Sequence, residues 1–381
     1  MITIRKAMYT GLALVASGAV LAGCAAAPTE TPAPTTSGDA TTDPTVEPAA
    51  DFLPCIVSDA GGWDDASFNY LAKIGIDRAA EELGVEAKAV ESEAEDDYAP
   101  NINTLVDQGC DLIITVGFAL SAGTVEAALA NPDIMFAIVD DAADNDFDGA
   151  TDAPNIRPLL FDTAQAAFLA GYAAADTSKT GIVGTFGGVN FPTVSIFMDG
   201  FAQGVAYYNE VKGADVKVVG WDHATMDGTF VSTEPGIGFS AGPEALATAQ
   251  GILNQGVDVI LPVGGPIYQS AGIAIQDSGK DIALIGVDSD TYLTDQTGLQ
   301  PFFLTSVRKL IDAAVYDTVM AAGTGSFTTE PFIGTLENAG VGIAEFHDWA
   351  SKVRPELSAE LESVAEGIIS GQIEVTSYLA G

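Results

Sequence analysis

Short, continuous apolar runs alternate with helix-like segments along most of this chain, and that alternation limits the fold more than any other feature. Unbroken runs of Val, Ile and Leu are typical of strands that helices cover on both faces of a parallel sheet. The pattern therefore predicts an α/β fold of doubly wound parallel sheets flanked by helices. The expected strands are Cys55–Ser58, Ala87–Val90, Leu112–Val116, Met135–Val139, Leu159–Phe161, Gly181–Thr185, Val216–Gly220, Val257–Val263, Ala283–Val287 and Phe302–Thr305. The expected helices include Tyr70–Leu83, Ala99–Gln108, Ala164–Ala175, Val194–Tyr208, Pro243–Gln255 and Tyr268–Ser278.

About ten strands are more than one compact sheet of this kind usually holds, so two lobes are expected. We assign residues 53–160 and 289–325 to lobe 1, and residues 161–288 and 326–381 to lobe 2. In open parallel sheets a ligand binds beyond the carboxyl ends of the strands. Two lobes that face each other by these edges would enclose a cleft. The residues at those ends are Asp59, Gly117, Phe118, Asp140, Asp141, Gly187, Gly188, Gly264, Gly265 and Asp288.

The first 23 residues have the pattern of an export signal. Arg5 and Lys6 precede an apolar stretch, Met8–Val20, that is too short to span a bilayer. The following Leu-Ala-Gly-Cys resembles a bacterial lipobox, which implies cleavage before Cys24 and lipid attachment to that cysteine. An ordinary export signal with a chance cysteine is the alternative. We expect a lipid anchor that holds the protein at the extracytoplasmic face of the cell membrane.

Residues 24–52 are rich in Thr, Pro, Ala and acidic residues, and almost lack large apolar side chains. Such a segment cannot bury enough surface to offset its ordering entropy, so it is predicted to be a disordered tether. The whole chain carries 14 Lys and Arg against 53 Asp and Glu. This balance argues against nucleic-acid binding, which needs a basic surface, and against a bare polyanion as the ligand.

The loop "DAGGWDDASFN", residues 59–69, resembles the signature of the basic membrane protein family, the purine nucleoside receptor-like lipoproteins. Further family-like blocks follow in the same order, and the resemblance covers roughly residues 54–345. They are MFAIVD (135–140), FLAGYAAA (168–175), GGVNFPTVSIFMDGFAQGV (187–205), GVDVILPVGG (256–265), IGVDSD (285–290) and TSVRKLIDAAVYD (305–317). The resemblance implies a monomeric two-lobe binding protein of the type I periplasmic class. Such a protein delivers a solute, in the best understood members a purine nucleoside, to an ABC transporter permease.

The resemblance also implies roles for individual residues. Asp59 and Asn69 would hydrogen-bond the edge of the base, and Phe68 and Phe197 would stack on its two faces. Stacking on an aromatic side chain contributes roughly 1–3 kcal/mol per base. The ribose would be held by Asp140, Gly264, Asp288 and Lys309. An ionised carboxylate suits a diol because it accepts two hydrogen bonds at once.

Each of these residues also has a plainer interpretation that the sequence leaves open. The two phenylalanines could belong to the core. Asn69 could only cap a helix, Asp288 could cap a hinge, and Lys309 could lie on the surface.

Two segments depart from the family pattern or suggest another ligand. The stretch 221–246 is longer and more irregular than the usual block, and Trp63 and Trp221 are extra aromatics expected near the cleft rim. They leave a sugar or another small polar solute as the alternative ligand. The segment "DNDFDG", 144–149, begins like a calcium loop, but Asn155 stands where a bidentate Glu belongs. We expect a solvated acidic loop and no metal.

Catalysis finds little support in the sequence. The chain has only two histidines, His223 and His347, no Gly-x-Ser-x-Gly elbow, and no Cys/His zinc spacing. Asp64 and Asp65 could in principle act as an acid–base pair, but they are better placed to solvate the loop or cap the next helix. We therefore expect a binding protein without a cofactor, with an exported nucleoside or sugar hydrolase as the less favoured alternative.

Cys55 and Cys110 are predicted to form a disulfide. Cys55 begins the first strand, and Cys110 directly precedes the third. In a sheet of order 2-1-3, these strands are parallel neighbours about 4.8 Å apart, within the Cα separation that a disulfide needs. The bond would lie at the amino-terminal end of the sheet, opposite the ligand edge. The alternative is two buried free thiols.

Overall fold

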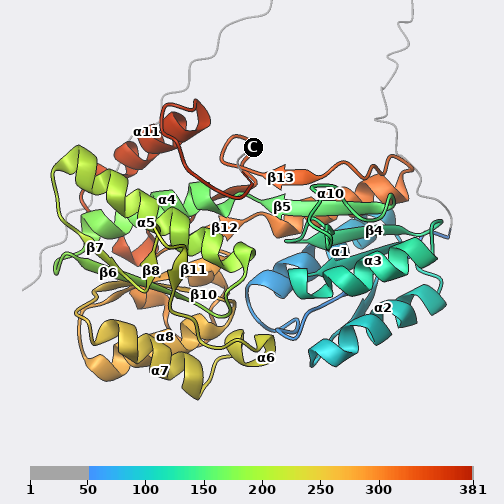
Figure 1. The fold of residues 1–381 in the computed structure, drawn as a ribbon, viewed down its shortest axis with the longest axis horizontal. Helices are drawn as coiled ribbons and strands as arrows, with labels where there is room; N and C mark the ends of the chain where they lie inside the picture. Colours follow the sequence, from blue (N-terminus) through green and yellow to red (C-terminus); the bar gives the residue numbers. More distant parts are fainter. Residues whose placement is uncertain (1–50, 380–381) are drawn as a thin grey trace, which may run out of the picture. The chain divides into compact units, whose positions relative to one another are not determined.

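The computed structural model describes residues 51–379 (Figure 1), and in this range the chain forms two lobes, each built on a six-stranded sheet. The predicted signal peptide (1–23), Cys24 and nearly all of the predicted tether (24–52) lie outside the described residues. The helices and strands confirm the predicted alternation. They also confirm the predicted type I periplasmic-binding-protein architecture.

The first lobe contains an all-parallel sheet of order β13-β5-β4-β3-β1-β2. Its strands are β1 (Pro54–Val57), β2 (Lys88–Val90), β3 (Leu112–Val116), β4 (Met135–Val139), β5 (Ile156–Phe161) and β13 (Phe332–Gly334). Its helical segments are α1 (Phe68–Leu83), η1 (Glu95–Asp97), α2 (Tyr98–Asp107), η2 (Phe118–Leu120), α3 (Ser121–Ala130) and α10 (Ile311–Gly323). Every residue of β1 and β3 is buried, as continuous apolar runs in a covered sheet require.

The second lobe has a sheet of order β14-β12-β11-β10-β6-β7, in which only β14 runs antiparallel to its neighbour. Its strands are β6 (Ile182–Gly187), β7 (Lys217–Val219), β10 (Val259–Val263), β11 (Ala283–Asp288), β12 (Phe303–Lys309) and β14 (Val341–Ile343). A small hairpin joins β8 (Trp221–Asp222) to β9 (Asp227–Gly228). The helical segments are α4 (Thr163–Thr177), α5 (Pro192–Lys212), α6 (Pro235–Gly238), α7 (Pro243–Leu253), α8 (Ile267–Ser278), α9 (Thr291–Thr294), η3 (Gln300–Phe302), η4 (His347–Trp349) and α11 (Leu357–Ile369).

Two glycine-bearing blocks of the sequence form the closest helix pair of this lobe, α4 against α5. A Cβ atom added to Gly171 of α4 would lie 2.1 Å from the carbonyl oxygen of Phe201. A Cβ atom on Gly204 of α5 would lie 2.0 Å from that of Phe168. Each helix therefore needs glycine where the partner backbone approaches, which gives "FLAGYAAA" and "GFAQGV" a packing role.

The chain passes between the two sheets three times, from β5 to α4, from β12 to α10, and from β13 to β14. This corrects the predicted lobe boundaries. Residues 289–325 were assigned to lobe 1, but β12 pairs with β11 in the second sheet, and only the following α10 packs on α1. Residues 326–381 were assigned to lobe 2, but β13 pairs with β5 in the first sheet. The physical reason is that β12 pairs with the free edge of β11, and β13 pairs with the free edge of β5.

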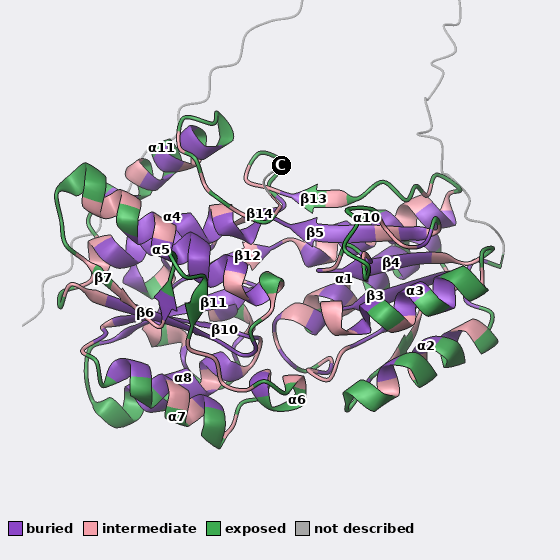
Figure 2. Cartoon of the chain, viewed as in Figure 1, coloured by how far each residue is buried: buried purple, intermediate pink, exposed green. Residues whose placement is uncertain are grey.

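Burial follows the layer arrangement. The inner strands of both sheets are buried, and exposed residues gather on the outer faces of the helices (Figure 2). Within residues 51–379, no helix is both long enough and apolar enough to cross a membrane.

The predicted disulfide is confirmed. Cys55 and Cys110 are bonded, with their Cα atoms 6.0 Å apart, and both side chains are buried. β1 pairs in parallel with β3, and Pro54 lies opposite Leu112. The first and third strands are therefore adjacent, as predicted, and their pairing brings the two cysteines together.

Candidate functional site

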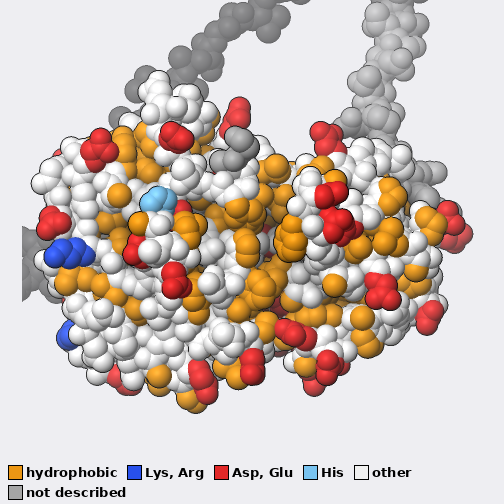
Figure 3. Space-filling view, viewed as in Figure 1, with side chains coloured by type: hydrophobic (Ala, Val, Ile, Leu, Met, Phe, Trp, Pro, Cys, Tyr) orange, Lys and Arg blue, Asp and Glu red, His pale blue; other side chains and the backbone are white. Residues whose placement is uncertain are grey.

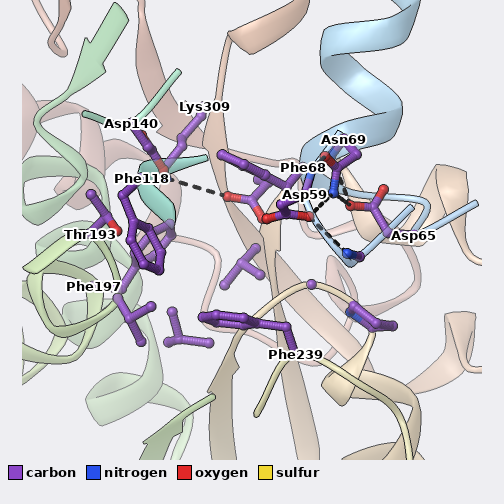
Figure 4. Close-up of a pocket in the computed structure, with 18 residues that line it drawn as sticks. Asp59, Asp65, Phe68, Asn69, Phe118, Asp140, Thr193, Phe197, Phe239 and Lys309 are labelled. Carbon is purple, nitrogen blue, oxygen red and sulfur yellow. Dashed lines mark hydrogen bonds and ion pairs between the residues drawn. The ribbon is translucent and has the colours of Figure 1, made fainter. Parts of the chain in front are cut away.

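One cavity lies between residues from the carboxyl ends of both sheets (Figure 4), with about 540 Å³ of atom-free space, part of it open to solvent. Hydrophobic side chains gather along the seam between the two halves of the molecule (Figure 3). All eight residues predicted to contact a ligand line this cavity: Asp59, Phe68, Asn69, Asp140, Phe197, Gly264, Asp288 and Lys309. The other lining residues are Gly61, Asp65, Phe118, Thr193, Val194, Phe239, Val263, Gly265, Pro266 and Val287.

Asp65 organises the loop between β1 and α1. Its carboxylate accepts hydrogen bonds from the backbone N–H groups of Ser67 (2.9 Å), Asn69 (2.8 Å) and Tyr70 (3.0 Å). These are donors at the start of α1 that have no partner within the helix, so Asp65 is the residue that caps α1. The capping role left open for Asn69 is therefore wrong. Burial raises the pKa of Asp65 to about 7.

Asn69 holds Asp59 in place. Its Nδ2 donates to Asp59 Oδ1 over 2.7 Å and to Asp65 Oδ2 over 3.2 Å, and its Oδ1 accepts from the backbone N–H of Asp59 over 3.3 Å. Both amide hydrogens of Asn69 are thus used within the protein. Asp59 Oδ1 also accepts from the N–H of Gly61, whereas Oδ2 has no hydrogen-bond partner among residues 51–379. That oxygen is an acceptor available to a ligand, and burial raises the pKa of Asp59.

Lys309 joins the two lobes' buried carboxylates. Its ammonium group pairs with Asp140 Oδ2 and lies 3.8 Å from Asp288 Oδ1. Only 4% of Lys309 is exposed, so the surface position left open for it is wrong. Burial raises the pKa of Asp140 to about 6, against the opposing effect of Lys309, and burial raises the pKa of Asp288 in the same way.

Asp140 and Asp288 share an unusual backbone conformation. Their φ angles are 63° and 65°, in the left-handed region that non-glycine residues seldom adopt. Asp140 directly follows β4, and Asp288 is the last residue of β11, so the two lobes present the same kind of residue at equivalent places. Strain of this kind concentrates at functional sites, because the surrounding structure must hold it.

Phe68 and Phe197 come from opposite lobes and both face Lys309. The Lys309 ammonium lies 5.3 Å from the centroid of the Phe68 ring and 4.9 Å from that of Phe197, within the range of cation–π attraction. Phe68 is the first residue of α1, and Phe197 lies in α5. Phe197 also belongs to the hydrophobic core, so the core interpretation and the pocket position both hold for it.

Phe118 and Phe239 are lining residues for which the sequence suggested no role. Phe118 was recognised only as a strand end, and Phe239 lies in the irregular stretch 221–246. The prediction that Trp221 lies near the cleft rim is wrong, because this residue is buried and its Nε1 donates to Asp199 Oδ1 over 2.8 Å. Trp63 is likewise not among the residues that line the cavity.

In the acidic loop after β4, aspartate side chains accept hydrogen bonds from the loop's own backbone N–H groups. Oxygens of Asp144, Asp146 and Asp152 lie within 4.8 Å of one another. The Asp144 carboxylate accepts hydrogen bonds from the N–H groups of Asp148 and Gly149. Asn155, at the position where a calcium loop needs a Glu, donates instead to three backbone carbonyls.

Comparison with known proteins agrees with this architecture. The Bmp family model, described as ABC transporter substrate-binding protein PnrA-like, matches residues 54–228. Basic membrane protein A of Borreliella burgdorferi is 30% identical over 321 residues, covering 83% of this chain and 86% of the relative. The ABC transporter nucleoside-binding protein BmpA of Lactococcus lactis is 27% identical over 389 residues, covering 98% and 99% of the two chains.

A solved structure with the same fold comes from Aeropyrum pernix. It is an ABC transporter system solute-binding protein with a TM-score of 0.71 and 24% identity, covering 86% of this chain and 94% of its own. A fold likeness at this identity supports the two-lobe architecture, and the sequence matches supply the family. The chain belongs to the Bmp family of PnrA-like ABC transporter substrate-binding proteins.

Proposed function

We propose that this protein captures a purine nucleoside between its two lobes and delivers it to an ABC importer. The observation that carries the proposal is one pocket in which two phenylalanines from opposite lobes flank a buried Asp140–Lys309–Asp288 group. A nucleoside has the matching parts, a flat base and a polar sugar. The nucleoside-binding relative from Lactococcus lactis supports the same class of ligand.

The base would lie between Phe68 and Phe197, and an N–H group on its edge would donate to Asp59 Oδ2. The ribose hydroxyl groups would donate to Asp140 and Asp288, and Lys309 would donate to a ribose oxygen. Asn69 would act on the ligand through Asp59, because its own amide hydrogens are already bonded. Gly264 would allow the sugar to approach the backbone closely because it has no side chain, and its φ of 153° is one that other residues seldom adopt.

Binding without catalysis is part of the proposal. Neither His223 nor His347 lines the pocket, and its charged groups are four aspartates and one lysine. Buried carboxylates around a neutral, donor-rich ligand suit capture and release. A reaction at the glycosidic bond would release free base, which chromatography of an overnight incubation with inosine detects. We expect the inosine to remain intact.

Titration calorimetry tests the ligand class. Guanosine, inosine and adenosine are compared with arabinose, galactose and myo-inositol, which represent the alternative class of sugars and other small polar solutes. We expect saturable binding of at least one nucleoside and none of the sugars. Binding of a sugar with no response to any nucleoside would overturn the proposal. Native mass spectrometry of the purified protein gives an independent check, because tightly bound ligands are often retained.

We further propose that the mature chain is anchored through lipid on Cys24. The support is the lipobox-like Leu-Ala-Gly-Cys sequence. Mass spectrometry of the membrane-extracted protein should show a chain that begins at Cys24 and carries acyl groups. A Cys24→Ala variant should lose them, and unmodified Cys24 in the wild-type protein would contradict the anchor.

A further inference from the structure

Pro235 and Phe239, two residues of the irregular stretch 221–246, line cavities between the lobes. After the β8–β9 hairpin, Phe230 bridges to Gly187 at the end of β6, and the chain then enters the short helix α6. In Figure 1, α6 is the part of the second lobe drawn beside the first. Pro235, its first residue, lies around the same small cavity as Ala60 and Tyr98 of the first lobe. This stretch therefore brings the second lobe to the first at the loop that carries Asp59.

Phe118 and Phe239 meet across the lobes, with ring centroids 6.3 Å apart. Phe118 also packs on Phe191 of the second lobe, with centroids 3.9 Å apart. Phe118 and Phe239 line the main pocket on one side and a smaller chamber on the other. The two rings therefore border both spaces, and Asp59 and Gly61 also border both of them.

The side chamber has about 230 Å³ of atom-free space, part of it open to solvent, and it is mostly apolar. Besides the two phenylalanines, Asp59 and Gly61, its walls are Ala60, Tyr98, Ala119 and Pro235. The Tyr98 hydroxyl accepts a hydrogen bond from the backbone N–H of Ala60 over 3.2 Å, which fixes the far wall. The small side chains Ala60 and Ala119 leave the space open. A chamber with this mostly apolar lining suits a small apolar group.

We propose that this chamber receives a one-carbon substituent on the edge of the base that Asp59 holds, so that the ligand class includes base-methylated purine nucleosides. This inference rests on the proposed nucleoside function, because the base must lie between Phe68 and Phe197 for its edge to reach Asp59. A singly methylated exocyclic amine keeps one N–H group. It can therefore still donate to Asp59 Oδ2 while its methyl group enters the chamber.

The test compares each parent nucleoside with its methylated partner by titration calorimetry. The pairs are adenosine with N6-methyladenosine, and guanosine with N2-methylguanosine. In at least one pair we expect the methylated partner to bind as tightly as its parent or up to about fourfold more tightly, the factor that burial of one methylene group contributes. N6,N6-dimethyladenosine, which has no exocyclic N–H group, should bind at least tenfold more weakly than N6-methyladenosine.

Variants show whether the methyl group occupies this chamber. Ala119→Leu fills it and should weaken the methylated partner at least tenfold while the parent still binds. Ala122→Leu is the matched control, since Ala122 is exposed on the neighbouring α3. If Ala119→Leu binds no nucleoside at all, Ala60→Leu replaces it in the test. Ala60 lies in the loop after β1 and lines the same chamber.

The outcomes separate the two proposals. If neither parent nucleoside binds the wild-type protein, the proposed function itself fails. If the parents bind but the methylated partner is weaker in every pair, only the chamber proposal is overturned. Equal binding of both partners to the wild-type protein and to the filled variants also overturns it, because the methyl group would then lie elsewhere.

Discussion

Ser67 Oγ donates a hydrogen bond of 2.9 Å to Oδ2 of Asp288, so the residue before α1 in the first lobe is tied to the end of β11 in the second. The same hydroxyl lies 3.2 Å from the carbonyl oxygen of Val287. A second serine makes a similar contact in the other direction, because Ser289 Oγ donates to the carbonyl oxygen of Ala66 over 3.1 Å. Side chains next to the pocket therefore hold the lobes together.

Ser67→Ala should speed ligand release. It removes a buried hydrogen bond to a charged group, which contributes about 1.5–3 kcal/mol, so we expect at least a tenfold higher dissociation rate. Stopped-flow measurement of nucleoside release checks this. Ser178→Ala is the control, since Ser178 bonds to Asp258 within the second lobe, and it should leave the rate unchanged. An equal effect of the two variants would contradict a specific role for the Ser67–Asp288 contact.

Lys309→Met should strongly destabilise the protein. It leaves Asp140 and Asp288 buried without their positive partner, and breaking one side of a buried pair costs about 3–5 kcal/mol. Urea denaturation measures this loss. The double variant Lys309→Met/Asp140→Asn should recover part of it, because one uncompensated charge is gone.

A matched lysine distinguishes burial from charge alone. Lys179 pairs with Asp281 at the surface, where 74% of its side chain is exposed. Lys179→Met should change the urea midpoint little, because exposed ion pairs contribute little to stability. A similar loss in both lysine variants would show that total charge, and not the buried group, controls stability.

Phe68→Ala should weaken nucleoside binding by about 1–3 kcal/mol, the contribution of stacking one base on an aromatic side chain. Titration calorimetry measures it. Phe332→Ala is the control, because Phe332 packs on Phe161 at the edge of the first sheet, away from the pocket lining. If Phe68→Ala binds the nucleoside with unchanged affinity, the Phe68 ring packs within the protein and does not stack on the base.

Asp65 should make the protein less stable as the pH rises. Burial raises its pKa from 3.8 to about 7, so the folded chain holds the proton more tightly than the unfolded chain does. The resulting stability is fully present below pH 3.8 and is lost as the pH rises through about 7. Between pH 5 and 7.5 the loss for this group is roughly 2–3 kcal/mol.

Thermal unfolding of the wild-type and Asp65→Asn proteins at these two pH values checks the effect. The wild-type protein should lose more stability than Asp65→Asn between the two, even though the variant is weaker overall from the damaged cap. Asp64→Asn is the control at the neighbouring exposed aspartate, and it should follow the wild-type protein. Parallel curves for all three proteins would show that Asp65 does not titrate in this range.

Cys55→Ala/Cys110→Ala should lower stability without weakening ligand binding. The bond closes a loop with a sequence separation of 55, for which the chain-entropy model gives roughly 4 kcal/mol. It lies at the amino-terminal end of the first sheet, opposite the pocket. Urea denaturation and calorimetry measure the two effects separately. Two free thiols in denatured, unreduced protein that lacks Cys24 would contradict the disulfide.

Much of the sheet structure could be predicted because most strands are short apolar runs that the local sequence shows. Each of the ten predicted strands overlaps a strand of the structure. The short strands β13 and β14 were missed because no helix separates them, so they lack the alternation of strand and helix that marks the others. The lobe of β12 was assigned wrongly because an apolar run does not specify its partner. That choice is made by the free edge of β11.

The site residues that could be predicted are those at strand ends and those within the family-like blocks. Those signals place Asp59, Asp140 and Asp288 together at the carboxyl ends of the strands. Capping of the next helix was predicted for Asp64 and Asp65 together, and the structure confirms it for Asp65. The sequence could not tell the two apart, because the cap depends on a tight turn in which Ala66 has a φ of 54°. Phe239 carries no local signal either. Its irregular surroundings indicated only a departure from the family, and contact with Phe118 across the lobes gives it a place in the pocket.

The three passages between the sheets also determine when each half of this protein can fold. Strand β5 remains an open edge until residue 334 is available to pair with it, and α1 stays uncovered until α10 has formed. A chain that emerges from its amino-terminal end must therefore deliver most of the second lobe before the first is complete. A fragment that ends near residue 162 would lack both pieces, so the first half alone would leave β5 unpaired and α1 uncovered. Unfinished molecules would expose an unpaired strand edge, the feature that aggregation and chaperone binding both exploit.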